Sequence, residues 1–206
     1  AVILPGTKST IADLLWLRAQ GFEPLLQHLG RTGTAVVGIC GGYQMLGQRI
    51  QDPLQVESPL PEVPGLGLLP LETVFAEHKA TYQAEARVVG GAGWLAALQG
   101  ATLHGYEIHM GHTLSPQPWL TIARHHGASQ TVADGMSTDT GQIWGCYLHG
   151  LFENTSLRHA WLTSLGWVGN AASQTPAQPW QAALDALVSQ VETHLDMARL
   201  EAIIWG

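Results

Sequence analysis

The spacing of apolar and polar residues along the first fifty positions predicts strands alternating with helices. The predicted elements are a strand over 1–4, a helix from Ser9 or Thr10 to Gly21, a helix over 23–29 ended by Gly30, and a strand over 35–39. The strand over 35–39 is apolar on both faces, as in a parallel sheet covered by helices on both sides. The order strand, helix, strand, helix, counting the apparent helix that begins near Tyr43, therefore predicts an α/β fold with a mostly parallel central sheet flanked by helices.

The middle of the chain shows a two-residue alternation of apolar and polar side chains, which is typical of strands. The stretch 51–70 is rich in proline and is expected to be irregular. After it, strands are predicted over 71–77, 81–89, 102–110, 120–125 and 142–148. A helical period returns over 154–165 and over 180–206, and residues 169–179, rich in Ala, Ser, Gln and Pro, are expected to be a linker. This predicts one domain over 1–168, followed by a linker and a C-terminal helix.

Composition excludes several classes of partner. The 206 residues carry 9 Lys and Arg against 16 Asp and Glu, a net charge of −7, which argues against nucleic acid as a partner. Charged residues are 12% and apolar residues 46% of the chain, enough to bury a large core. No apolar run approaches the roughly 18 residues that cross a bilayer, so we expect a soluble protein without a membrane partner.

The two cysteines, Cys40 and Cys146, are too few for a disulfide framework, which favours a reducing cytoplasm. The N-terminus has no signal peptide and opens within a strand. We therefore expect a piece of a larger polypeptide that lacks the first strand and helix of its domain.

Cys40 is the candidate nucleophile. The segment Gly38-Ile39-Cys40-Gly41-Gly42 follows a buried strand and precedes an apparent helix, which is the layout of a nucleophile elbow. The helix directs its free N–H groups and positive dipole end at the sulfur, which favours the thiolate. A cysteine at a strand end is usually a small buried hydrophobe, but the flanking glycines favour a nucleophile here.

A nucleophilic cysteine needs a base, and His149 is the best placed of the ten histidines. It ends an apolar strand, at the edge where α/β sheets hold their sites. His109 and His112 end another strand and could line the same crevice. Together with Glu107 they would be the best metal ligands, but their spacing does not aim both rings at one ion, so no metal is predicted.

An oxyanion formed during acyl transfer needs two N–H donors. One would be the N–H of Gly41, which follows the nucleophile, and the other that of Gly6, provided that the first strand lies beside the strand over 35–39. A simple strand-to-helix turn at Pro5-Gly6 fits the sequence equally well.

Four segments in this order resemble one family: VILPGTKSTIADLLWLR, GICGGYQMLG, GYEIHMGHT and GCYLHGLFEN. They are similar to the glutamine amidotransferase domain of cobyric acid synthases, a class I, triad-type amidotransferase with a flavodoxin-like fold. The resemblance implies that Cys40 attacks the side-chain amide of glutamine and that His149 transfers the protons. It also implies oxyanion donors at Gly41 and Gly6, and glutamine contacts at Gln44 and Gly42.

In that family the released ammonia amidates the b, d, e and g carboxylates of a corrinoid, adenosylcobyrinic acid a,c-diamide. An N-terminal synthetase domain uses ATP and magnesium for this step. That domain is absent from this sequence, and no Walker-type loop occurs in it, so we expect no cofactor in this chain.

One position departs from the family pattern and leaves alternatives open. Many triad amidotransferases have an acid two residues after the histidine, where this chain has Leu151. Glu153 has the wrong spacing, so His149 either works in a Cys–His dyad or is oriented by an acid from elsewhere. Alternatives to the function itself are the glutaminase domain of a cobyrinic acid a,c-diamide synthase or of a cell-wall amidating enzyme, a cysteine hydrolase, and a non-catalytic interaction domain.

Overall fold

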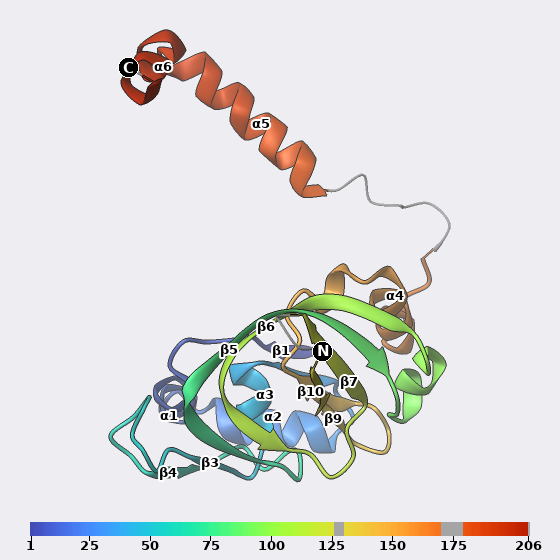
Figure 1. Ribbon diagram of the computed structural model, residues 1–206. Helices are drawn as coiled ribbons and strands as arrows, with labels where there is room; N and C mark the ends of the chain where they lie inside the picture. The colour runs from blue at the N-terminus through green and yellow to red at the C-terminus, as the bar shows by residue number, and fades with distance from the viewer. Residues whose placement is uncertain (126–129, 170–178, 206) are drawn as a thin grey trace. The chain divides into compact units, whose positions relative to one another are not determined.

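The computed structural model describes residues 1–125, 130–169 and 179–205. The chain divides into two compact units, Ala1–Trp167 and Val168–Gly206, and each is described by itself. Figure 1 labels the elements along the chain.

A small parallel sheet lies at the centre of the first unit. Its strands are β1 (Val2–Leu4), β2 (Val36–Ile39), β10 (Ile143–Cys146) and β9 (Met136–Ser137), in the order β1-β2-β10-β9. Strands β1, β2 and β10 are parallel, and the edge strand β9 is antiparallel to β10. The predicted α/β fold with a parallel central sheet is therefore confirmed.

Helices follow the first two strands of this sheet, as the sequence predicted. They are α1 (Thr10–Ala19), α2 (Phe22–Arg31) and α3 (Gly41–Leu46), and α4 (Thr155–Ser164) follows β10. Gly21 separates α1 from α2 in a left-handed conformation, with φ 78°. The predicted end of α2 at Gly30 is wrong, since the helix continues to Arg31. Gly30 is instead a packing residue, because a Cβ there would lie 3.0 Å from Cδ1 of Ile143 on β10.

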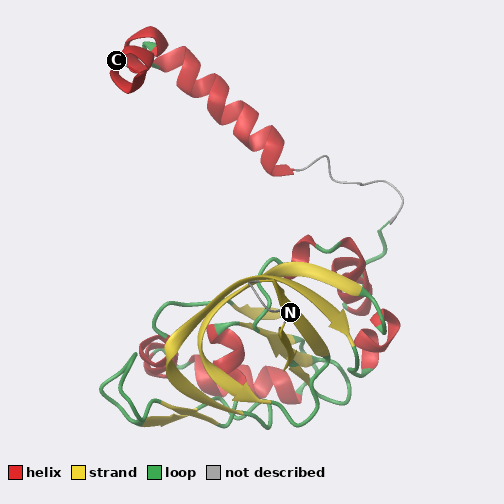
Figure 2. Cartoon of the chain, viewed as in Figure 1, coloured by secondary structure: helices red, strands yellow, loops and turns green. Residues whose placement is uncertain are grey.

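A second, larger sheet is built from the middle of the chain (Figure 2). Its members are β3 (Arg49–Gln51), β4 (Glu62–Pro64), β5 (Glu72–Val88), β6 (Thr102–Leu114), β7 (Leu120–His125) and β8 (Gln130–Asp134). The order is β4-β3-β5-β7-β8, with β6 also paired to β5, and every pair except β3–β5 is antiparallel. The predicted β-rich middle is thus confirmed, whereas its division into a separate sheet was not predicted, and the strand predicted over 142–148 belongs to the parallel sheet as β10.

Some predicted strand boundaries in this sheet are wrong. The two strands predicted over 71–77 and 81–89 are one strand, β5, whose pairing with β6 shifts register between Val74 and Lys79. The stretch 51–70, predicted as irregular, contains the short strand β4, and β8 was not predicted at all.

The hydrophobic core consists of two clusters that meet at β2. Val36 belongs to the cluster that includes α1 and α3, and Val37 belongs to the one that includes β5, β7 and α4. Both side chains are fully buried. Strand β2 is therefore covered on both faces, which explains its uninterrupted apolar sequence.

The second unit holds two helices, α5 (Pro179–His194) and α6 (Met197–Trp205). The prediction of one helix over 180–206 is wrong because Asp196 starts a new one: its carboxylate accepts the N–H of Arg199 at 3.0 Å, as a helix N-cap does. The predicted linker over 169–179 lies, apart from its two end residues, outside the described residues. Within the described ranges, no helix is long and apolar enough to cross a membrane.

Candidate active site

Cys40 occupies the sharp turn between β2 and α3. Its backbone has φ 53° and ψ −112°, and among the described residues only Gln55 is another non-glycine residue with positive φ. Such a conformation costs of order 1–3 kcal/mol and persists only where the surroundings enforce it. Here the Cys40 N–H donates to the carbonyl of Cys146 at 2.9 Å, and the Cys40 carbonyl accepts the N–H of Gln44 at 3.0 Å. The predicted nucleophile-elbow geometry is confirmed.

The glycines of the elbow allow α3 to pack directly against β1. A Cβ on Gly42 would lie 2.0 Å from the carbonyl oxygen of Leu4, and the N–H of Gly42 donates to the carbonyl of Pro5 at 3.1 Å. Gly42 does not line the cavity at Cys40, and its N–H already has an acceptor. The structure therefore gives Gly42 a packing role and does not bring it to the site where a glutamine contact was predicted.

A cavity of about 640 Å³ opens at the carboxyl ends of the parallel strands. Of the predicted site residues, it is lined by Gly6, Cys40, Gln44 and His149. The remaining wall comes from Thr7, Lys8, Ser9, Thr10, Val56, Glu57, Phe75, Ile108, His109 and Met110. The structure thus brings the cysteine, the histidine and the Pro5-Gly6-Thr7 loop to one place.

Gly6 lies between the cysteine and the histidine. A Cβ on Gly6 would be 3.0 Å from Cε1 of His149 and 3.4 Å from Cβ of Cys40, so both side chains lie against this glycine. Nε2 of His149 is buried and has no hydrogen-bond partner in the described part of the chain. Burial, and then the nearby His109, lower the pKa of His149. His149 is therefore neutral near pH 7, the state in which an imidazole accepts a proton.

His109 lines the same cavity but is not available as a base. Its Nδ1 lies 3.2 Å from the carbonyl of Gly111, and its Nε2 lies 3.1 Å from Oε1 of Glu107. Because a carbonyl oxygen only accepts, Nδ1 carries a hydrogen, and Nε2 is occupied by the buried carboxyl group. The prediction that His109 lines the crevice is confirmed, whereas His112 lines a different cavity. His109 and His149 thus line the cavity at Cys40, and Nε2 of His149 has no hydrogen-bond partner among the described residues.

The predicted oxyanion donors, the N–H groups of Gly41 and Gly6, lie near Cys40, and Gly6 but not Gly41 is among the residues that line its cavity. Gly41 is the first residue of α3, so its N–H has no acceptor within the helix. In the described ranges, neither this N–H nor that of Gly6 donates to another backbone carbonyl. A Cβ on Gly41 would lie 2.7 Å from Cγ2 of Thr7, which places Gly41 against the loop that carries Gly6.

Gln44 lies in the cavity wall with its side chain held by three hydrogen bonds. Oε1 accepts the hydroxyl of Thr10 at 3.1 Å, and Nε2 donates to the Met110 carbonyl and to the Tyr147 hydroxyl, each at 3.0 Å. Both amide hydrogens are therefore used within the protein, and only Oε1 has capacity left for a ligand.

Glu57 is a cavity residue that sequence reasoning missed. Its carboxylate accepts the N–H of Ile11 at 2.8 Å, and burial raises its pKa above the ordinary value. It lies in the irregular stretch between β3 and β4, where no periodicity marks one acid over another. Only the fold shows that this segment reaches the cavity.

No acidic side chain orients His149 through a hydrogen bond within the described residues. Leu151, two residues after His149, is apolar, 2% exposed and packs in the core. Also within the described ranges, no three His, Cys, Asp or Glu side chains gather in a way that could hold a metal ion. The absence of a metal from the reaction remains a prediction.

The fold and this cavity define a class: an α/β protein with a cysteine at a strained strand-to-helix turn, an adjacent neutral histidine and free backbone donors. A family model described as the CobB/CobQ-like glutamine amidotransferase domain matches residues 1–157. The chain therefore belongs to the CobB/CobQ-like glutamine amidotransferase family.

Curated relatives carry a more specific name. A cobyric acid synthase of Moorella thermoacetica is 45% identical over 213 residues, covering 98% of this chain and 40% of that protein. One of Roseiflexus castenholzii is 49% identical over 170 residues, covering 81% of this chain and 33% of that protein. The chain thus spans two fifths or less of the length of these relatives.

A solved glutamine amidotransferase structure matches 80% of this chain and 78% of its own, with 18% identity and a TM-score of 0.47. A similarity of that size assigns no function by itself.

Proposed function

We propose that this chain is the glutaminase part of a cobyric acid synthase, which hydrolyses glutamine through a cysteinyl thioester. One observation carries the proposal: Cys40, in its strained turn, shares a cavity with the neutral His149, and both lie against Gly6. The family match and the names of the relatives support the same conclusion. The alternative of a cobyrinic acid a,c-diamide synthase uses the same glutaminase chemistry, and these names favour cobyric acid synthase over it.

The proposed reaction begins when Sγ of Cys40 attacks the side-chain carbonyl carbon of glutamine. His149 accepts the thiol proton, and the N–H groups of Gly41 and Gly6 bind the oxyanion that forms. When the C–N bond breaks, His149 donates the proton to the leaving nitrogen, and ammonia departs from a γ-glutamyl thioester. His149 then takes a proton from water, whose oxygen attacks the thioester carbon and releases glutamate and the free thiol.

The cavity also offers partners for the charged end of glutamine. Glu57 presents a carboxylate that suits an α-ammonium group, and Lys8, on the same cavity wall, suits an α-carboxylate. The remaining lone pair of Gln44 Oε1 is a further acceptor. This arrangement favours a free amino acid as the substrate, because a glutamine inside a peptide has neither charge.

The remaining steps belong to the part of the relatives that this chain does not span. We propose that the ammonia passes to an ATP- and magnesium-dependent synthetase, which amidates the b, d, e and g carboxylates of adenosylcobyrinic acid a,c-diamide. A reducing cytoplasm suits a reaction that needs Cys40 in its reduced thiol form.

The test is to incubate the chain with L-glutamine and to measure glutamate, ammonia and the acid-quenched protein mass. We expect equal amounts of both products and a γ-glutamyl adduct, which the Cys40→Ala variant does not form. D-Glutamine and a glutamine-containing peptide are the substrate controls. Hydrolysis that persists in Cys40→Ala, or equal hydrolysis of the peptide, would contradict the proposal.

A further inference from the structure

His149 is held in place by its backbone, and the partner is Tyr106 on β6. The N–H of His149 donates to the carbonyl of Tyr106 at 2.8 Å, and the N–H of Tyr106 donates to the carbonyl of His149 at 3.2 Å. The two residues form an isolated antiparallel bridge outside the named strand pairs. This reciprocal pair fixes the position from which the imidazole projects.

The side chains of the same two residues are stacked. Their ring centroids are 5.0 Å apart and their planes are inclined by 9°, so the phenol and the imidazole stack nearly parallel to each other. The backbone bridge and the ring stack are made by the same pair of residues. Rotation of the imidazole about its Cβ–Cγ bond would break this stack, and in the described part of the chain no hydrogen bond to Nε2 opposes that rotation.

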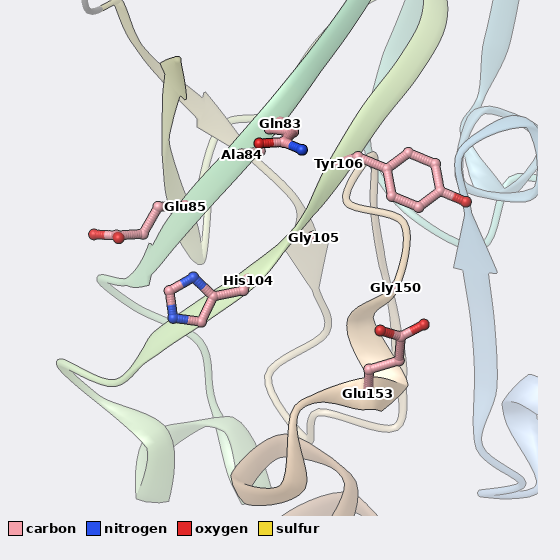
Figure 3. Close-up of a pocket in the computed structure, with 8 residues that line it drawn as sticks. All are labelled: Gln83, Ala84, Glu85, His104, Gly105, Tyr106, Gly150 and Glu153. Carbon is pink, nitrogen blue, oxygen red and sulfur yellow. The ribbon is translucent and has the colours of Figure 1, made fainter. Parts of the chain in front are cut away.

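Glu153, the first acidic residue after His149 in the sequence, lines a different cavity. Gly150, with φ 72°, turns the chain directly after His149, and Glu153 ends the short helix η2 (Leu151–Glu153). Glu153 lines a separate cavity of about 620 Å³, which it shares with Tyr106 and Gly150. Figure 3 shows the Glu153 carboxylate and the Tyr106 ring on the same side of this second cavity.

We propose that Tyr106 is the positioning residue for His149 and takes the place of the acidic third member of a catalytic triad. This rests on the proposed function of the site. The acid of a triad does two things: it orients the imidazole and it stabilises the imidazolium that forms. The Tyr106 ring supplies both, because the stack restricts the orientation of the imidazole and the electron-rich face of the ring attracts the cation.

Three variants of Tyr106 distinguish the contribution of its aromatic ring from those of its hydroxyl group and of its size. Tyr106→Phe keeps the stack, whereas Tyr106→Leu keeps an apolar side chain without a ring face, and Tyr106→Ala removes both. None of these variants alters the backbone N–H and carbonyl that hold His149. Trp16→Ala is the matched control, since Trp16 is an exposed aromatic residue on α1 that contacts Phe22 outside the active-site cavity.

The first measurement is the steady-state hydrolysis of L-glutamine. We expect kcat to fall about 10- to 100-fold in Tyr106→Ala and Tyr106→Leu, the effect of a misplaced catalytic group, with KM changed less than about 3-fold. Tyr106→Phe and Trp16→Ala should retain wild-type kcat. A thermal unfolding curve for each variant excludes a general loss of structure.

The second measurement is the rate at which iodoacetamide alkylates Cys40, read by peptide mass mapping. It reports how well His149 takes up the thiol proton and needs no glutamine turnover, so it tests Tyr106 even if the proposed function fails. We expect alkylation to slow in Tyr106→Ala and Tyr106→Leu and to stay unchanged in Tyr106→Phe. The inference is overturned if Tyr106→Leu matches the wild type in this rate, or if Tyr106→Phe is as slow as Tyr106→Ala.

Discussion

The two cysteines of this chain lie at the ends of neighbouring strands, and their backbones are joined by a hydrogen bond from the Cys40 N–H to the Cys146 carbonyl. Cys40 has left-handed backbone geometry and lines the active-site cavity. Cys146 continues the regular strand β10, is fully buried, and packs in the opposite core cluster. Burial, and then Asp134, raise the pKa of the Cys146 thiol well above its ordinary value.

Both thiols are buried, and the comparison shows that the turn, and not the place in the sheet, brings one of them to the cavity wall. A residue that continues a parallel strand directs its side chain into one of the two cores, as Cys146 does. A residue forced into positive φ at the start of a helix is turned toward the strand ends, where the cavity lies. The predictions below test this difference in order of expected effect.

The largest effect is expected when each of the two thiols is removed in a separate variant and the two variants are compared. Cys40→Ser should lower glutamine hydrolysis by at least about 10,000-fold, because the nucleophile of a covalent mechanism is lost. Cys146→Ala should keep near-wild-type kcat and lose only about 1–2 kcal/mol of folding free energy, as is usual for a small core truncation. For each variant, ammonia release measures kcat and thermal unfolding measures the loss of stability. Comparable losses of kcat in the two variants would show that the turn does not set the reactivity.

Removal of the proposed base, His149, is expected to have the next largest effect. His149→Ala should slow hydrolysis by about 100- to 10,000-fold, the range for a positioned general base. His104→Ala, on an exposed position of β6, is the matched control and should leave the rate unchanged. If the His149 variant keeps its rate, another group transfers the protons.

A methyl group between the side chains of Cys40 and His149 should have an intermediate effect. In Gly6→Ala the added Cβ would lie 3.0 Å from the His149 ring, tighter than ordinary contact, and would separate it from Cys40. We expect kcat/KM to fall about 10- to 100-fold. Thermal unfolding near the wild-type temperature would show that the loss is local, and a kcat/KM within 2-fold of wild type would exclude this arrangement of the three residues.

The smallest effect concerns pH. A general base works in its neutral form, and burial lowers the pKa of His149 from the ordinary value of 6.5. Neutral imidazole therefore persists to lower pH than in an exposed histidine. The acid limb of kcat/KM for glutamine should lie below pH 6.5, and a limb above that value would mean that His149 is not in the buried environment described.

The local sequence was enough to predict the cysteine half of the site. Gly38 to Gly42 lie within one strand, one turn and one helix, so their geometry follows from neighbours in sequence and from tight packing. His149 could be predicted for a similar reason, because an apolar strand ends just before it. Parallel strands bring their carboxyl ends to the same edge, so two local predictions were sufficient to join Cys40 and His149.

The rest of the site depends on contacts between residues far apart in the sequence, which no local sequence pattern predicts. Glu57 reaches the cavity from an irregular stretch, and Tyr106 on β6 meets His149 through an isolated bridge between residues far apart in the sequence. Gly30 was misjudged because a glycine that serves packing cannot be told from one that ends a helix. Asp196 was missed as a helix start because the apolar period continues across it.

Covalent labelling with 6-diazo-5-oxo-L-norleucine, a reactive diazo-ketone analogue of glutamine, is the most direct test of the central claim. The labelled chain is digested, and the modified cysteine is located by peptide mass mapping, with and without excess L-glutamine. We predict one label, on Cys40, that glutamine prevents, while Cys146 stays unmodified. A label on Cys146, or a label on Cys40 that glutamine does not slow, would contradict the account.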